Sequence, residues 1–413
     1  LVKNSMVHFS VVDATKLRSI AMAQQGLHKN AAFGRGRTGV LQMISQLGYL
    51  QLDSISVVVR AHRHILSTRV PGADLRHLGR LLADREIYEY RFPVAAYHPM
   101  SEFRFASHHM AWRREMNQRQ FRVRREDRAM MARVLDRIRE EGPLRSRDFE
   151  AGPRKSGGWW QWKPAERALE MLYYQGDLMV SARDGLEKSF DLTERVVPAD
   201  IDTSTPDMEE YVRYLIRSVM RAHGFASYRT LTSPARGVPV RKAMLSELAR
   251  QVSEGELFQF VDKTGEKLWG MPDLVEGRLP RVAEKVRILS PFDNLVTERE
   301  RLSNVFGFDY QIECFVPEGK RKYGYFCLPV MMGKSFMARM DCKSHRDEGR
   351  FEIKALYLEP EFATRRAFAS MAHDFVRAIR EYALFDGCKD VIVMETAPEF
   401  ARGMLRSQLK STP

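Results

Sequence analysis

Two parts of the sequence repeat the same order of elements, and this repeat constrains the fold more than any other feature. In residues 128–192 and again in residues 208–270, two stretches with apolar residues at helical spacing precede a pair of short alternating runs. Each pair of runs is connected by a turn that contains a glycine, as is common in β-hairpins. The first turn has Gly185 after Asp184, and the second has Gly265. Helices followed by a two-stranded wing form the winged-helix pattern, so at least two such units are predicted in tandem.

The sequence on either side of this repeat indicates two further regions. Residues 11–50 contain two helical stretches, and the first follows Asp13, a residue type that commonly caps helices. Residues 51–64 come next and begin by alternating like a strand. Beyond residue 286, short alternating runs separated by polar turns indicate a β-meander or small barrel. A chain of 413 residues is expected to divide in this way, because one hydrophobic core rarely extends so far.

The composition narrows the classes of function. The formal net charge of +13 favours a polyanionic partner, most commonly nucleic acid, although a merely basic surface would carry the same charge. No apolar run approaches the roughly 20 residues that span a bilayer, so no membrane partner is expected. The four cysteines are not spaced as CxxC, which argues against a zinc knuckle and for buried thiols in a reducing cytoplasm. We expect neither a metal nor a cofactor.

Residues 51–64 open with a polar pair, Gln51 and Asp53, on either side of Leu52. Alternate side chains of a strand share a face, so Gln51 and Asp53 would stand side by side. A carboxylate accepts hydrogen bonds and an amide both donates and accepts, so this pair could hold and polarise one water. Such a pair suits attack on C1′ of a nucleotide, which gains oxocarbenium character as the base leaves. Most Gln-x-Asp triplets on strands are solvated edge residues, and the motif alone leaves this alternative open.

Several segments together resemble the winged-helix DNA glycosylases of the AlkZ/YcaQ type. They are LQLDSISVVVRAHRHILSTRV, SGGWWQWKPAERALEMLYYQGDLMV, FDLTERVVP, LSPFDNLVTERERL, CFVPEGKRKYGYFCLPV and GRFEIKALYLEP. The resemblance implies an α+β fold of three tandem winged helix-turn-helix domains and a C-terminal β-barrel-like domain, with a concave DNA-binding surface. The expected boundaries are residues 1–125, 126–205, 206–285 and 286–413.

The resemblance also implies an activity. Members of the family hydrolyse the N-glycosidic bond of cationic N7-alkylguanine and leave an abasic site without cutting the strand. The family motif is Gln, an apolar residue, then Gln or Asp, so Gln51 and Asp53 are the expected catalytic pair. The aspartate places the chain nearer the YcaQ-like branch, which unhooks interstrand crosslinks. The expected partner is double-stranded DNA carrying alkylated guanine, bound by a monomer in the bacterial cytoplasm, at the nucleoid.

Basic and aromatic residues in three segments are candidates for DNA contact. One set follows the polar pair, one lies in a Gly/Trp turn, and one lies in PEGKRK, where the family presents a hairpin to DNA. The candidates are Arg60, His62, His64, Arg69, Trp159, Lys163, Lys320, Arg321 and Lys322. The alternatives are structural: histidines satisfied in the core, tryptophans used for packing, and a solvated charged turn.

One segment departs from the family. Where the YcaQ-like pattern has Trp and His, this chain has Arg91, Phe92 and Pro93, and His98 lies nearby. If the family histidine shapes the lesion pocket, the departure bears on substrate range or activity. The alternative function is therefore a non-catalytic winged-helix DNA-binding protein, either a regulator or a relative that binds lesions without excising them.

Overall fold

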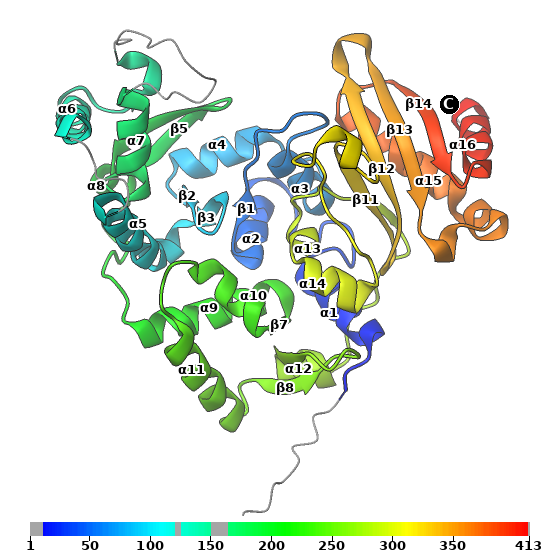
Figure 1. Cartoon of the computed structure of the whole chain (residues 1–413), viewed down its shortest axis with the longest axis horizontal. Helices are drawn as coiled ribbons and strands as arrows, with labels where there is room; N and C mark the ends of the chain where they lie inside the picture. Colours follow the sequence, from blue (N-terminus) through cyan, green and yellow to red (C-terminus); the bar gives the residue numbers. More distant parts are fainter. Residues whose placement is uncertain (1–10, 120–124, 150–163, 412–413) are drawn as a thin grey trace, which may run out of the picture.

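The computed structural model describes residues 11–119, 125–149 and 164–411. Within these residues the strands form four small sheets, three of three strands and one of five, with helices between them (Figure 1). None of the helices found there is long and apolar enough to cross a membrane.

Each three-stranded sheet belongs to a group of elements with one plan: a helix, a short strand, one or two further helices and a hairpin. In each sheet the third strand lies between the first and the second, and every pairing is antiparallel. The first group comprises α2 (Gly36–Leu47), β1 (Leu50–Gln51), α3 (Ala61–Arg69), α4 (Leu75–Ala83), β2 (Ile87–Arg91) and β3 (Ala95–Pro99). The second comprises α6 (Arg125–Glu141), β4 (Leu144–Arg145), α7 (Pro164–Tyr174), β5 (Leu178–Asp184) and β6 (Glu187–Leu192). The third comprises α9 (Met208–His223), β7 (Phe225–Ser227), α10 (Tyr228–Thr232), α11 (Arg241–Ser253), β8 (Phe258–Val261) and β9 (Lys267–Gly270).

Both hairpins expected from the sequence are confirmed. The β5–β6 connection turns at Gly185 and the β8–β9 connection at Gly265, with φ of 61° and 84°. Glycine adopts this left-handed backbone without a steric penalty, which is why the turns could be located from the sequence.

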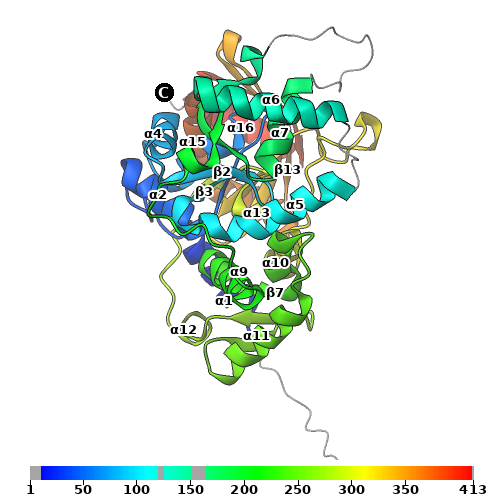
Figure 2. The ribbon, with the colours of Figure 1, turned by 90° about the vertical axis from the view of Figure 1, so that its left-hand side faces the viewer.

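The N-terminal helix α1 (Ala14–Gln24) begins at Asp13, whose carboxylate accepts the backbone N–H of Thr15. Its buried Leu17 and Ile20 join a cluster with Phe225 of the third group, so α1 packs there rather than on the group that follows it in sequence (Figure 2). The remaining short connecting helices are α5 (Ser107–Arg119), α8 (Thr193–Val196), α12 (Pro272–Glu276), α13 (Asn294–Thr297) and α14 (Arg299–Arg301).

The C-terminal region forms a five-stranded sheet at one end of the molecule (Figure 1). Its strands lie in chain order: β10 (Val286–Ile288), β11 (Cys327–Met332), β12 (Ser335–His345), β13 (Arg350–Leu358) and β14 (Asp390–Ala397). Helix α15 (Arg365–Phe385) connects β13 to the parallel strand β14, and α16 (Phe400–Ser411) follows.

Two expectations for this region are corrected. The sheet is open, with β10 and β14 at its edges, and not a closed barrel. Residues 309–316, one of the alternating runs beyond residue 286 that were expected to form strands, lie instead in a long loop with a single 3₁₀ turn, Glu318–Lys320. In place of a barrel closure, the buried face of α15 covers the sheet, with Phe368, Phe375 and Ile379 in its core.

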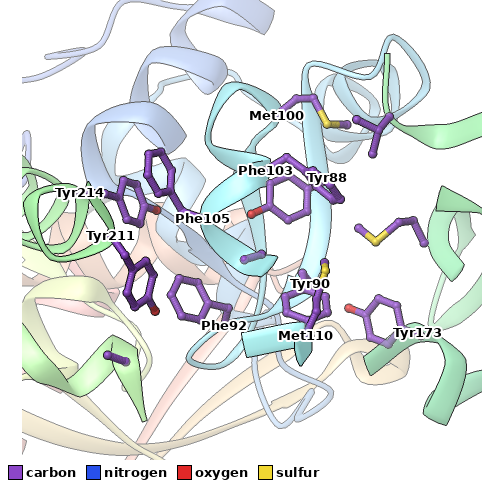
Figure 3. Close-up of a cluster of buried hydrophobic side chains, with 14 of the residues drawn as sticks. Tyr88, Tyr90, Phe92, Met100, Phe103, Phe105, Met110, Tyr173, Tyr211 and Tyr214 are labelled. Atoms are coloured by element: carbon purple, nitrogen blue, oxygen red, sulfur yellow. The ribbon is translucent and has the colours of Figure 1, made fainter. Parts of the chain in front are cut away.

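Aromatic side chains join the three groups in one buried cluster (Figure 3). Tyr90 of β2 meets Tyr173 of α7 edge to face, with 5.6 Å between ring centroids. Phe105, after β3, stacks on Tyr214 of α9 at 3.9 Å. Such pairs add to the hydrophobic effect of burial, so the first group is held against both of its neighbours.

Candidate catalytic cleft and DNA interface

Gln51 is the last residue of strand β1 and pairs with Ala96 of β3. The backbone N–H of Leu52 still donates to Ala95 at 2.8 Å, but the strand then ends. It ends because the carboxylate of Asp53 accepts the backbone N–H of Ile55 at 3.0 Å, a local turn that competes with strand pairing.

The expectation of a longer strand is therefore wrong beyond Gln51. Residues 53–60 form a loop and residues 61–69 form helix α3. The β-branched residues of this loop are apolar because they pack into a distant core and not because they pair in a sheet. Val58 and Val59 are buried in the core of the C-terminal sheet, and Ile55 packs against it. The segment that carries Asp53 is thus anchored between the first group and the C-terminal region.

Asp53 lines a cleft of about 550 Å³ between the first group and the β5–β6 hairpin of the second. The other titratable side chains that line it are Arg60, His62, Tyr97 and Arg183. Helix α4 supplies an apolar wall through Leu75, Leu78 and Leu82. Gln51, half-buried, does not line this cleft, so the structure does not bring both members of the pair into one hollow.

Partial burial of Asp53 raises the pKa of its carboxyl group above the ordinary value of 3.8. The backbone N–H groups of Ile55 and Ser54 and the positive charge of Arg60 oppose this shift, because they favour the ionised form. A carboxylate with a raised pKa is a stronger base than a solvated one. Asp53 therefore suits the acceptance of a proton from a water molecule in this cleft.

His62 lies in the same cleft in its neutral form. Burial and the nearby charges of Arg60, Arg183 and Arg63 lower its pKa to about 4. Its Nδ1 is buried and has no hydrogen-bond partner among the residues that the structure describes. His62 can offer a neutral hydrogen bond but not a cation for a phosphate near neutral pH.

A buried ion pair fixes the far wall of the cleft. Arg183 of β5 donates to both carboxylate oxygens of Glu89 on β2, at 2.5 and 2.7 Å, and Glu89 is only 1% exposed. This bidentate contact joins the hairpin of the second group to the sheet of the first. The two residues are 94 positions apart, and no local pattern in the sequence indicated their pairing.

Comparison with known proteins identifies the family of this chain. A family model described as "DNA glycosylase AlkZ-like" matches residues 44–378. The chain belongs to the AlkZ-like DNA glycosylase family. A solved structure, the Streptomyces sahachiroi DNA glycosylase AlkZ, superposes with a TM-score of 0.61 over 94% of this chain and 100% of that chain. Its sequence is 14% identical, so this second match shows the fold alone. This AlkZ-like chain is therefore a DNA glycosylase of mixed α/β architecture, as the sequence predicted.

Two of the predicted DNA contacts are wrong for this AlkZ-like protein, because His64 and Arg69 face inward from α3. Arg69 is fully buried, and all five N–H donors of its guanidinium are satisfied. Two of these bonds reach the Asp293 carboxylate, at 2.6 and 2.8 Å. His64 bonds through Nε2 with the carbonyl of Ile288 at 2.9 Å, and burial lowers its pKa to about 4. Both residues hold α3 against the C-terminal region.

The predicted basic hairpin is a folded loop, residues 309–326, without strands. Lys320 and Lys322 are exposed on it. Arg321 is half-buried, donates through Nε to the carbonyl of Val316 at 2.9 Å and lies over the Tyr325 ring. Lys320 is free to meet phosphate, the Nζ of Lys322 lies 4.9 Å from the centroid of the Tyr323 ring, and Arg321 shapes the loop. Trp159 and Lys163 lie outside the described residues, and their predicted contacts stay predictions.

The family departure at Arg91, Phe92 and Pro93 forms the turn between β2 and β3. Phe92 is buried, and with Pro93 and His98 it lines a hollow of about 80 Å³ beside Tyr49. The His98 ring stacks on Tyr88 at 5.3 Å between centroids, and burial lowers its pKa to about 4. His98 does not line the Asp53 cleft, because it points to the opposite face of β3 from Tyr97.

Proposed function

We propose that this glycosylase excises cationic N7-alkylguanine from double-stranded DNA, including guanine held in interstrand crosslinks, and leaves an abasic site. Asp53 polarises the attacking water and accepts its proton, and its negative charge stabilises the oxocarbenium-like sugar. Gln51, two residues away at the end of β1, does not line the cleft, and its role in positioning the water or the sugar is assigned from the family motif. The water oxygen bonds to C1′ as the C1′–N9 bond breaks, and the bonding electrons neutralise the alkylated ring.

The observation that carries this proposal is that the titratable side chains lining the cleft with Asp53 are poor proton donors near neutral pH. Of the titratable groups that line it, His62 is neutral with a pKa of about 4. Burial raises the pKa of Tyr97 far above its ordinary value, and desolvation of Arg183 is outweighed by the hydrogen bonds and charge of Glu89, which raise the pKa of Arg183. These groups are poor proton donors to a departing base near neutral pH. N7-alkylguanine needs no such donor, because it leaves as a neutral molecule.

A crosslinked substrate is consistent with the position of Asp53. Asp53 lies on a loop, is only partly buried and is followed by the exposed Ser54. A base that is tied to the opposite strand cannot rotate fully out of the helix as base-flipping enzymes require. A carboxylate on a partly exposed loop can reach the sugar of such a nucleotide without full rotation of the base out of the helix.

We further propose that the three groups of elements are winged-helix units that grip the duplex, as a monomer. Their shared helix–strand–helix–hairpin plan and the net charge of +13 support this assignment. Within the described residues, Arg60, Lys320 and Lys322 are the members of the predicted set proposed to meet phosphates, and His62 is proposed to meet the lesion.

The test compares base release from otherwise identical duplexes that carry one N7-methylguanine, one N7-linked crosslink or one uracil. Abasic sites are detected by alkaline cleavage. The proposal predicts release from the first two duplexes and little or none from uracil, which leaves as an anion without protonation. Equal release of uracil, or no release of N7-methylguanine, would contradict the proposed specificity.

A further inference from the structure

The loop at residues 309–326 carries an exposed aromatic residue, Phe315. Its side chain is 80% exposed, more than the other large hydrophobic side chains in the described part, of which Val11 follows at 68%. An aromatic ring held in water forgoes the stabilisation that burial provides. A large exposed ring on a folded loop therefore indicates a binding role when its surroundings fit one partner.

The loop that presents Phe315 is well ordered by its own hydrogen bonds. The carboxylate of Glu313 accepts the backbone N–H groups of residues 322–324, at 2.8 to 3.1 Å. Arg321 ties the loop to the carbonyl of Val316. A ring on a preorganised loop loses little conformational entropy when it binds, so its contact area is used efficiently.

Phe315 lies next in sequence to a residue that shares a core with the Asp53 loop. Cys314 and Ile55 both pack against the buried cluster of the C-terminal sheet. Burial and, after it, the negative charge of Asp53 raise the pKa of the Cys314 thiol, in agreement with this shared packing. The loop that carries Phe315 and the loop that carries Asp53 are therefore anchored on the same buried cluster.

The cations of this loop are consecutive, Lys320, Arg321 and Lys322, and both lysines are exposed. The exposed carboxylates are Asp309 and Glu318, whereas the Glu313 carboxylate is occupied by backbone N–H groups. An aromatic ring flanked by cations is a recurrent way to hold a base and its phosphates together. Apolar side chains at protein–DNA interfaces also enter base steps and unstack them.

We propose that Phe315 inserts beside the lesion, stacks on the neighbouring base and unstacks that step, so that C1′ of the alkylated nucleotide reaches Asp53. Phe315 acts as a positioning residue, not as a catalytic one. That the inserted ring lies beside an N7-alkylguanine rests on the proposed function. The insertion itself can be tested with any duplex in which the stacking of one base step is weakened.

The first arm of the test uses 2-aminopurine, whose fluorescence rises when it is unstacked, placed beside a tetrahydrofuran abasic analogue. Wild-type protein should raise the fluorescence, Phe315→Ala should not, and Phe315→Tyr should restore the rise. Met394→Ala on β14, another exposed apolar side chain at 45%, is the matched control and should behave as wild type. Equal rises with wild type and Phe315→Ala, or no rise with wild type, would overturn the proposal.

The second arm measures single-turnover base release from an N7-methylguanine duplex. Loss of one aromatic–base stack should slow release by Phe315→Ala roughly 5- to 150-fold while binding to undamaged DNA changes little. A slower release with an unchanged fluorescence rise would contradict insertion. Failure of wild type to release the base would sink the proposed specificity but leave the fluorescence arm intact. Dimerisation of wild type that Phe315→Ala abolishes would assign the ring to a second copy of the chain instead.

Discussion

Arg69 provides a direct test of the assignment of α3 to the molecular interior. We predict that Arg69→Met destabilises the protein by about 3–5 kcal/mol, the cost of leaving one member of a buried ion pair without its partner. The size follows from the geometry, because both Arg69 and Asp293 are fully buried and the substitution leaves the carboxylate without two of its hydrogen bonds. Arg69→Lys should cost less, since an ammonium keeps the charge but has three donors in place of five.

The control is Arg63→Met on the same helix. Arg63 is exposed and donates one hydrogen bond to the carbonyl of Phe385 at 3.1 Å, so its loss should cost less than about 1 kcal/mol. Urea denaturation measures stability for each variant, and titration of DNA binding against salt measures phosphate contacts. Arg69→Met with near wild-type stability, weaker DNA binding and a salt slope reduced by about one unit would refute the reasoning and restore Arg69 as a phosphate contact.

Two further predictions concern the loop lysines and the protonation of Asp53. Lys320→Ala and Lys322→Ala should each weaken DNA binding uniformly across sequences and reduce the salt slope by about 0.9; an unchanged slope would exclude both from the interface. Because burial raises the pKa of Asp53, its ionised form lowers stability above that pKa, and this cost disappears as pH falls through it. Asp53→Asn should therefore raise the thermal midpoint near pH 8 by more than near pH 4, and a lower midpoint at pH 8 would contradict the burial of the charge. As the pH is lowered, base release should also begin to decline before the pH reaches 3.8, the ordinary pKa of aspartate, because Asp53 is protonated at a higher pH. A rate that stays constant down to pH 3.8 would exclude Asp53 as the base.

The parts of the fold that local patterns control could be predicted from the sequence. The hairpins at Gly185 and Gly265 and the helix start at Asp13 are each set by a few neighbouring residues. The position of Gln51 in a strand followed in the same way. The remainder of residues 51–64 did not, because an apolar β-branched run looks alike whether it pairs in a sheet or packs as a loop into a distant core.

Long-range contacts explain why the basic residues could not be sorted correctly. Arg69 meets Asp293 across 224 positions, and nothing local separates it from an arginine that faces DNA. The same holds for His62 and His64, which lie on one helix: the first lines the cleft and the second contacts Ile288. Tyr97 and His98 lie on opposite faces of β3, and only the tertiary structure shows that the Tyr97 face borders the cleft.

The central claim is that Asp53 activates the water that displaces the base, and single-turnover release of N7-methylguanine tests it most directly. Wild type, Asp53→Asn and Gln51→Ala would be compared at saturating enzyme, with DNA affinity measured in parallel. Asn retains the size of Asp53 and can accept the Ile55 N–H, so it removes the charge and the base alone. The account predicts that Asp53→Asn slows release by roughly 100-fold or more with DNA affinity preserved, and that Gln51→Ala slows it by a smaller factor. Release by Asp53→Asn at the wild-type rate would contradict it.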